Sequence, residues 1–282
     1  MKSTAFSVRS RNWISDQITR SLPPMAQITI EFLGTGTSQG VPVIACNCEV
    51  CTSSDPKDNR LRSSALVRVG DVNLLIDAGP DLRQQVLRSK VDRLDAVLLT
   101  HEHMDHLAGI DELRSFNFRQ NKAMDIHANA ATIVAVRRMF HYAFTEVRYP
   151  GVPELHLHEI GDDPFHAAGI PITPVKVLHH MLPVLGFRIG RLGYITDAKS
   201  IEPQEIEKLK GVDVLVLNAL RRKEHLSHLN LSEAIDLVRA IGPRQAYFTH
   251  ISHLMGKHAD VMRELPEAIA LAHDGLIAPV LA

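Results

Sequence analysis

The sequence lacks the features of a membrane-spanning, disulfide-rich or strongly charged protein. No apolar run approaches the roughly 18–20 residues that a bilayer-spanning helix needs. Only three of the 282 residues are cysteine, and the formal net charge is -1. A charge so close to zero argues against general binding to nucleic acid or to a membrane surface. The remaining composition is that of a globular protein, long enough for one large domain or two small ones.

The first 24 residues differ from the rest of the chain. They mix basic, Ser and Asn residues without clear periodicity, lack the apolar stretch of a secretory signal, and close with Pro23-Pro24. We expect residues 1–24 to form a loosely ordered extension, or to be upstream sequence from a mis-set start codon. A weak amphipathic helix over Asn12–Arg20 is the alternative. Residues 25–282 are expected to form a single domain, and the missing signal predicts a cytoplasmic protein.

Strand-like and helical patterns alternate along this domain. Strands are expected over Ile28–Leu33, Ser64–Val69, Val72–Ile76, Ala96–Leu99, Ile172–Val177, Gly186–Ile189, Gly193–Ile195, Val214–Leu217 and Gln245–Phe248. Helices are expected over Leu82–Ser89, Leu107–Arg114, Ala130–Phe140, Pro203–Leu209, Ser232–Ala240 and Ala259–Leu265. Asn230 or Ser232 is the candidate N-cap of the helix near residue 232. Hairpins followed by alternating strands and helices predict an α/β fold of four αββα layers, with two mixed sheets face to face.

Four potential metal ligands stand within six residues, directly after an apolar strand. The run Ala96–Leu99 is followed by Thr100-His101-Glu102-His103-Met104-Asp105-His106. Because residues i and i+2 of an extended segment point to one side, His101 and His103 can converge on one ion. Where the chain turns into the next helix, Asp105 and His106 can face a second ion. Imidazoles and a carboxylate suit zinc, manganese or iron; a solvated histidine-rich loop is the competing interpretation.

The three cysteines form a second candidate metal site. Cys46, Cys48 and Cys51 lie within six residues of one another, an odd and clustered set that suits thiolate ligation better than disulfides. A structural zinc needs four ligands, and His253, three residues after His250, is the expected fourth. Three reduced, buried cysteines are the alternative. The preceding Gly34-Thr35-Gly36 is no phosphate-binding P-loop, since no Gly-Lys-Ser/Thr follows, and we expect a tight turn there.

The order H-x-H-x-D-H after a strand resembles the core motif of the metallo-β-lactamase superfamily, and the resemblance extends from Ile28 onward. It implies the αββα sandwich and two catalytic divalent ions, zinc or manganese, beside the structural zinc. It also implies which residues hold them. One ion would be held by His101, His103 and His179, the other by Asp105, His106 and His250, with Asp197 bridging both. His180, adjacent to His179, is the alternative ligand.

The same resemblance extends to residues around the ligands. Asp77 matches a position that orients a ligand histidine from behind, or alternatively caps the following helix. The cysteine loop with Thr249–His253 resembles a narrower group, the phosphoribosyl 1,2-cyclic phosphate phosphodiesterases of the carbon–phosphorus lyase pathway. That resemblance implies His228 as general acid, against a helix-capping or surface role. It also implies a homodimer.

Two arginines are weaker candidates for contact with the substrate. Arg114 and Arg188 could each bind a terminal phosphate, because a guanidinium fork matches phosphate oxygens. Either is equally explained as a solvated surface arginine.

The function expected from these features is cleavage of a cyclic phosphate ester in a small phosphorylated sugar or nucleotide. Asp105 would orient the nucleophile, and neither a membrane nor a nucleic-acid partner is expected. A tRNA 3'-processing endonuclease shares the ligands, but its long basic arm has no counterpart in this sequence. A non-catalytic or redox metal protein is the alternative from another class.

Overall fold

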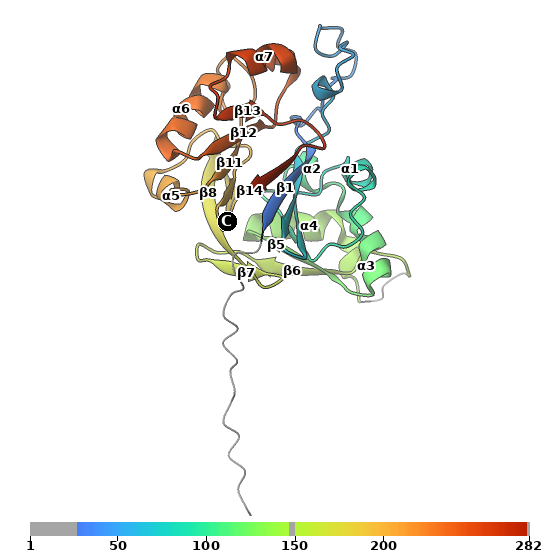
Figure 1. Cartoon of the computed structure of the whole chain (residues 1–282). Coiled ribbons are helices and arrows are strands. Elements are labelled where there is room, and N and C mark those ends of the chain that lie inside the picture. The colour runs from blue at the N-terminus through green and yellow to red at the C-terminus, as the bar shows by residue number, and fades with distance from the viewer. Residues whose placement is uncertain (1–26, 147–149, 281–282) are drawn as a thin grey trace, which may run out of the picture.

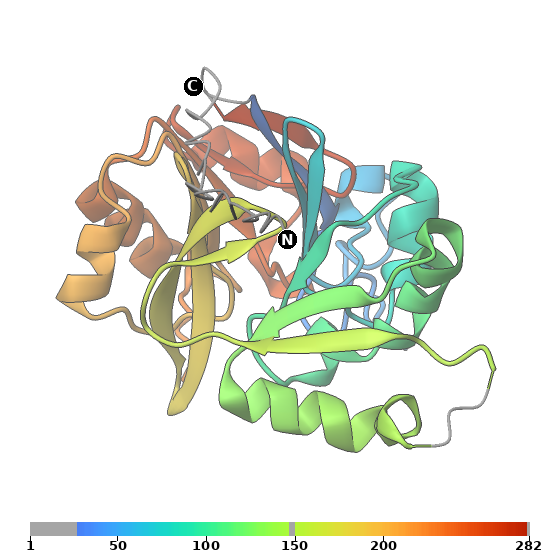
Figure 2. The ribbon, with the colours of Figure 1, turned by 90° about the horizontal axis from the view of Figure 1, so that it is seen from below.

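The computed structural model describes residues 27–146 and 150–280. The expected N-terminal extension and the alternative helix over Asn12–Arg20 lie outside these residues. The described chain forms two seven-stranded mixed sheets packed face to face, with helices on both outer sides (Figures 1 and 2). This confirms the four-layered αββα fold. Among the described residues, no helix is long and apolar enough to cross a membrane.

The first sheet is built from strands of the N-terminal half, with the last strand added at one of its edges. Its strands are β1 (Ile28–Gly34), β2 (Ser64–Val69), β3 (Val72–Ile76), β4 (Ala96–Leu98), β5 (Met124–Ala128), β6 (Leu155–Glu159) and β14 (Ile277–Val280). They lie in the order β14-β1-β2-β3-β4-β5-β6. Strands β3 to β6 are parallel, so the loops that follow them emerge at one edge of the sheet.

The second sheet comes from the C-terminal half. Its strands are β7 (Phe165–Ala167), β8 (Ile170–His179), β9 (Leu182–Ile189), β10 (Leu192–Tyr194), β11 (Val214–Asn218), β12 (Gln245–Thr249) and β13 (Ile269–Leu271). They lie in the order β13-β12-β11-β10-β9-β8-β7, and β10 to β13 are parallel. In each sheet, the parallel strands end at the same edge. The site described below lies where these two edges meet.

Helices cover the outer face of each sheet. On the first sheet lie α1 (Leu82–Ser89), α2 (Met104–Leu107), η2 (Ile110–Leu113), α3 (Arg114–Gln120), α4 (Ala130–Met139) and η3 (His141–Phe144). On the second lie α5 (Pro203–Lys208), α6 (Leu231–Ile241) and α7 (His258–Glu264). Short turns η1 (Pro56–Asp58) and η4 (His253–Met255) lie in the loops. A third apolar cluster, including Phe32 and Phe187, fills the space between the sheets.

Most predicted elements form within a residue or two of the expected bounds, and Asn230 is the N-cap of α6 in a reciprocal capping box with Glu233. The predicted helix over Leu107–Arg114 is wrong. The chain breaks near Gly109, whose N–H donates to the Ala78 carbonyl, and a Cβ at Gly109 would lie 2.0 Å from the Gly79 carbonyl oxygen. This close approach separates α2 from η2 and α3.

Candidate active site

The histidines and aspartates of the sequence motif meet where strands of both sheets end. The segment from Thr100 to His106 follows β4 in the first sheet. From the second sheet come the last residue of β8, His179, the loop after β10 with Asp197, and the residue after β12, His250. Folding therefore joins side chains up to 149 residues apart in the sequence, at the strand edge where α/β folds place their chemistry.

The first group of donors centres on His101. Its ring is fully buried and lies 4.6 Å from the ring of His103 and 6.0 Å from that of His179, centroid to centroid. The rings of His103 and His179 are 5.2 Å apart. His179 is half-buried and His103 is exposed, so this group opens to solvent on one side.

The second group of donors centres on His106. Its Nε2 lies 3.1 Å from Asp105 Oδ2 and 3.3 Å from Asp197 Oδ2. The other oxygen of Asp197 lies 3.3 Å from His250 Nε2. Donor atoms of Asp105, His106 and His250 lie within 4.8 Å of one another, as do those of His101, His106 and Asp197. Asp197 therefore stands between the two groups.

Four of the histidines share one arrangement: Nδ1 has a hydrogen-bond partner and Nε2 faces the centre. The Nδ1 partners are Thr100 Oγ1 for His101 (3.0 Å), Asp77 Oδ2 for His106 (2.7 Å), the Ser227 carbonyl for His179 (2.7 Å) and Ser63 Oγ for His250 (3.3 Å). The Thr100 hydroxyl can give its proton to Asp77, and the Ser63 hydroxyl to the Gly36 carbonyl. Each hydroxyl then accepts from its imidazole, which leaves Nε2 with a lone pair.

The surroundings of these Nε2 atoms indicate whether the site suits metal ions. His101 Nε2 and His106 Nε2 are buried without a hydrogen-bond partner. Burial lowers the pKa of His106, but Asp197, Asp77 and Asp105 outweigh it and hold that pKa well above its ordinary value. A buried nitrogen that faces two carboxylates favours a positive charge beside it, which a bound proton or a divalent cation would supply. The donor set of imidazoles and carboxylates is therefore suited to divalent ions such as zinc or manganese.

Three residues of the site adopt a left-handed backbone conformation. The φ angles are 61° at Asp77, 57° at Asp197 and 55° at His250. This conformation is unfavourable for residues other than Gly and persists only where neighbours hold it. The loop after Asp197 is held by Asn218, whose side chain bonds both the N–H and the carbonyl of Ala198. The strain lies at residues that aim side chains into the site.

Two further groups reach the reacting centre. His228 Nε2 lies 3.0 Å from Asp197 Oδ1, and its side chain is buried against the ring of His179 at 4.3 Å. Burial would raise the pKa of Asp105, but His106 and His250 hold it well below its ordinary range. An ionised carboxylate and an imidazole therefore flank the same space.

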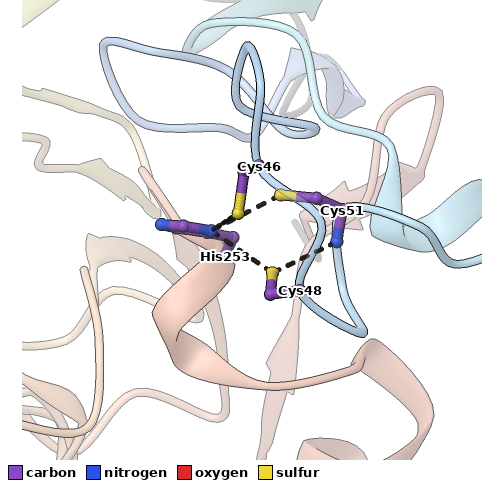
Figure 3. Close-up of side chains that lie close together, drawn as sticks. All are labelled: Cys46, Cys48, Cys51 and His253. Carbon is purple, nitrogen blue, oxygen red and sulfur yellow. Dashed lines mark hydrogen bonds between the residues drawn. The ribbon is translucent and has the colours of Figure 1, made fainter.

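The cysteine cluster forms as expected. Cys46 Sγ lies 3.3 Å from His253 Nδ1, and the sulfurs of Cys48 and Cys51 each lie 3.4 Å from it (Figure 3). Tetrahedral zinc with ordinary bond lengths would place such donors about 3.6 Å apart. The Cys51 N–H lowers the pKa of Cys48 to about 6, whereas burial raises that of Cys51 to about 11. All four side chains are half-buried.

The glycine-rich stretch ties the two clusters together. The N–H of Thr37 donates to the Ile251 carbonyl, and the N–H of Ile251 donates to the Thr35 carbonyl. Between them, a Cβ at Gly36 would lie 2.8 Å from the Arg60 carbonyl oxygen, so only glycine fits. The tight turn expected at Gly34-Thr35-Gly36 is not there, because Gly34 ends β1 and Gly36 forms bridges with Arg62 and Ile251. The turn comes next, where the Gly40 N–H donates to the Thr37 carbonyl. This short ladder fixes the segment that carries both His250 and His253.

The structure separates the remaining candidates. His179 points into the site, whereas His180 is exposed on the tip between β8 and β9. Arg188 as a phosphate contact is wrong: it pairs with Gly193, the middle residue of β10, and its guanidinium donates to three backbone carbonyls, those of Gly190, Lys208 and Lys210. Arg114 forms an ion pair with Asp111 at 3.3 Å. Its contact with a substrate phosphate stays a prediction.

Of the groups behind the histidines, sequence reasoning predicted Asp77 and missed the others. Thr100 stood next to His101 and could have been found from that adjacency. Ser63 had no local signal, because it meets His250 across 187 residues of sequence. The Ser227 carbonyl, which accepts from His179, is a backbone group and leaves no trace in a residue pattern.

Comparisons with known proteins identify the family of this chain and structures of similar fold. Residues 72–251 match the family described as Beta-lactamase superfamily domain. A solved structure of a new diphosphatase from the PhnP family is 37% identical, with a TM-score of 0.85, over 91% of this chain and 98% of that chain. The octanoyltransferase of Porphyromonas gingivalis is 42% identical over 87% of this chain but only 50% of its own length. This chain thus spans about half the length of that relative.

A further curated relative is similar over a shorter stretch. The ribonuclease Z of a Bradyrhizobium species is 33% identical over 131 residues, which is 45% of this chain and 39% of the relative.

Proposed function

The chain belongs to the β-lactamase superfamily, and on that premise we propose that it is a dinuclear metal-dependent phosphodiesterase acting on a small phosphorylated sugar or nucleotide. One observation carries the proposal most directly. Asp197 lies between two donor groups, and among the described residues the buried Nε2 atoms of His101 and His106 have no hydrogen-bond partner.

We divide the donor side chains into three groups, two for catalytic ions and one for a structural ion. We assign His101, His103 and His179 to one ion, Asp105, His106 and His250 to the other, and Asp197 to both. Cys46, Cys48, Cys51 and His253 would hold a structural zinc. Two divalent ions in such a site supply a hydroxide at neutral pH and neutralise charge on the phosphoryl oxygens.

The protein's own side chains orient the reactants and supply a proton. Asp105, ionised and beside the centre, can accept a hydrogen bond from the attacking oxygen and fix its direction. As the phosphorus–oxygen bond breaks, His228 can donate its Nε2 proton to the departing oxygen. Its position 3.0 Å from Asp197 supports this role, because it holds the ring at the edge of the site.

Two forms of substrate fit this chemistry. A cyclic phosphate ester is the form that the sequence resemblance implies, and its leaving oxygen stays attached to the product. A linear diphosphate is favoured by the 37% identical diphosphatase of the PhnP family. We do not infer acyl transfer from the similarity to the octanoyltransferase, because this chain matches only half of that protein.

The test is a substrate comparison with protein loaded with zinc or manganese. Bis-p-nitrophenyl phosphate, a ribosyl cyclic phosphate, a nucleoside diphosphate sugar and a precursor tRNA would be assayed side by side. Faster cleavage of the cyclic ester than of the others supports the first form, and faster cleavage of the diphosphate the second. Preference for precursor tRNA would replace both with the endonuclease alternative. No hydrolysis of any of these four substrates by the loaded protein would refute the proposal.

The role of His228 has its own test. His228→Ala should slow substrates with poor leaving groups most, because these need protonation, while a p-nitrophenyl ester leaves as a stable anion. Equal losses on both would assign His228 to positioning instead. His225→Ala is a matched control, since His225 touches His228 at 3.2 Å without touching Asp197.

A further inference from the structure

A second group of histidines lies on the exposed edge of the first sheet, away from the site above. β6 is the edge strand and runs parallel to β5, with Asp125 opposite His156 and His127 opposite His158. Residues i and i+2 of a strand share a face, so all four side chains lie on one face. We call Asp125, His156 and His158 the edge triad.

One carboxylate oxygen joins the edge triad. Asp125 Oδ1 lies 2.8 Å from His158 Nε2 and 3.7 Å from His156 Nδ1. Two imidazole nitrogens and a carboxylate oxygen bound to one ion at about 2.0–2.2 Å would lie roughly 3.0–3.6 Å apart. The two distances from Asp125 Oδ1 lie just below and just above that range, so the imidazole rings would have to turn for all three donors to meet at one ion. The side chain of His156 is 66% exposed, so its ring is free to turn toward the other two.

The surroundings hold His158 in place. The ring of His127 stacks on it at 4.7 Å, with 20° between the planes. His127 is in turn packed against Phe165 of the second sheet at 5.4 Å and is buried. A ligand ring fixed from behind loses less freedom on binding, which favours a preformed site. Lys122 approaches the other carboxylate oxygen, Asp125 Oδ2, at 3.2 Å and leaves Oδ1 to the imidazoles.

We propose that the edge triad binds a divalent transition ion of the zinc, nickel or copper type. Imidazole ligands select these ions over magnesium and calcium, which prefer oxygen. Three protein ligands leave at least one coordination position open. The site is distinct from the proposed catalytic centre, because Asp125 is the second residue of β5 and that centre lies beyond the opposite end of the neighbouring strand β4.

The experiment uses untagged full-length protein whose catalytic and cysteine groups have first been loaded with zinc. Free zinc is then titrated by equilibrium dialysis, while the histidine ring signals are followed by NMR. We expect one further zinc per chain and shifts at His156 and His158. His158→Gln should weaken this binding at least about tenfold, because it removes a direct ligand.

Two matched variants sharpen the result. His166→Gln removes an exposed histidine of β7 that has no part in the triad and should leave binding unchanged. Lys122→Met removes a positive charge beside the ion and should tighten binding about twofold, a small effect because the side chain is largely exposed. Phosphodiesterase activity and Tm should stay unchanged in all three variants.

The opposite outcome is equally clear. If the wild type takes up no more zinc than the His158→Gln variant, and both melt at the same temperature, the edge triad is a hydrogen-bonded surface cluster and the proposal is wrong. This result would leave the proposed catalytic function untouched, because the two tests share no residue.

Discussion

The two main donor clusters differ in depth and in openness, although the single segment Thr249–His253 contributes to both. His101, His106 and His250 are buried, yet their cluster opens to solvent through His103 and His179. The cysteine cluster is half-buried, and its four donors close on one another. An open coordination position marks a catalytic ion and a closed set of four a structural one. Burial therefore does not distinguish the roles; the geometry of the donors does.

The clusters also differ in what stands behind the ligands. The histidines of the candidate active site are held by a carboxylate, two hydroxyls and a carbonyl at Nδ1. The cysteine sulfurs are held mainly by backbone groups, since the N–H of Val43 donates to Cys51 and the N–H of Cys51 to Cys48. Substitutions behind the histidines should therefore lower metal affinity by graded amounts. The cysteine cluster should lose metal mainly when a ligand itself is removed.

The largest expected effect is on activity. His101→Ala should lower phosphodiesterase turnover by on the order of 10³-fold, the cost of losing a group that supports transition-state charge. The metal content should fall while the circular dichroism spectrum stays the same. His180→Ala is the control, because this neighbouring histidine is exposed and should be silent. Full activity in His101→Ala would remove the metal assignment.

In the cysteine cluster we expect a loss of stability larger than the loss of activity. Cys48→Ser should lower stability before chemistry, because binding of structural zinc is largely folding free energy. A loss of about 4 kcal/mol would lower Tm by roughly 10 °C in a chain of this size. Glu49→Gln, an exposed change in the same loop, should leave Tm unchanged. An unaltered Tm in Cys48→Ser would show that the cluster is not a structural zinc site.

A smaller effect is expected behind His106. Asp77→Asn removes the anionic acceptor from His106 Nδ1 and should weaken metal binding 10–100-fold, the usual cost of such a partner. Competition with a fluorescent chelator measures this without relying on turnover. Asp71→Asn, in the exposed turn before β3, is the control. Equal affinity in Asp77→Asn and wild type would assign Asp77 to helix positioning alone.

The smallest effect is expected behind His250. Ser63→Ala removes a neutral acceptor 3.3 Å from Nδ1, and the loss of about 1 kcal/mol would weaken metal binding about fivefold. Ser64→Ala removes a hydroxyl of similar burial that touches no imidazole, so it should change affinity less. A Ser63→Ala loss as large as that of Asp77→Asn would contradict the ranking of charged above neutral partners.

The layers of the fold and the set of candidate donor side chains could both be predicted from residue patterns alone. Alternating and helical periodicity report which face of an element is buried, so strands such as Ser64–Val69 and Val72–Ile76 formed where expected. The spacing of His101, His103, Asp105 and His106 is local and therefore readable. Five strands were not predicted: β5, β6, β7, β13 and β14. β7 and β13 have only three residues each, which leaves little periodicity to detect.

Packing between distant elements determines which groups lie behind the ligands and which partners the guanidinium of Arg188 binds. Ser63 reaches His250 through the pairing of β1 with β2 and the short ladder at Gly36, contacts that depend on distant chain segments. Arg188 faces away from the site because its strand position fixes its direction. The choice of His179 over His180 was decided by the turn, where His180 adopts a φ of 57° and the chain reverses. Such outcomes depend on packing between elements, which residue patterns within one element do not encode.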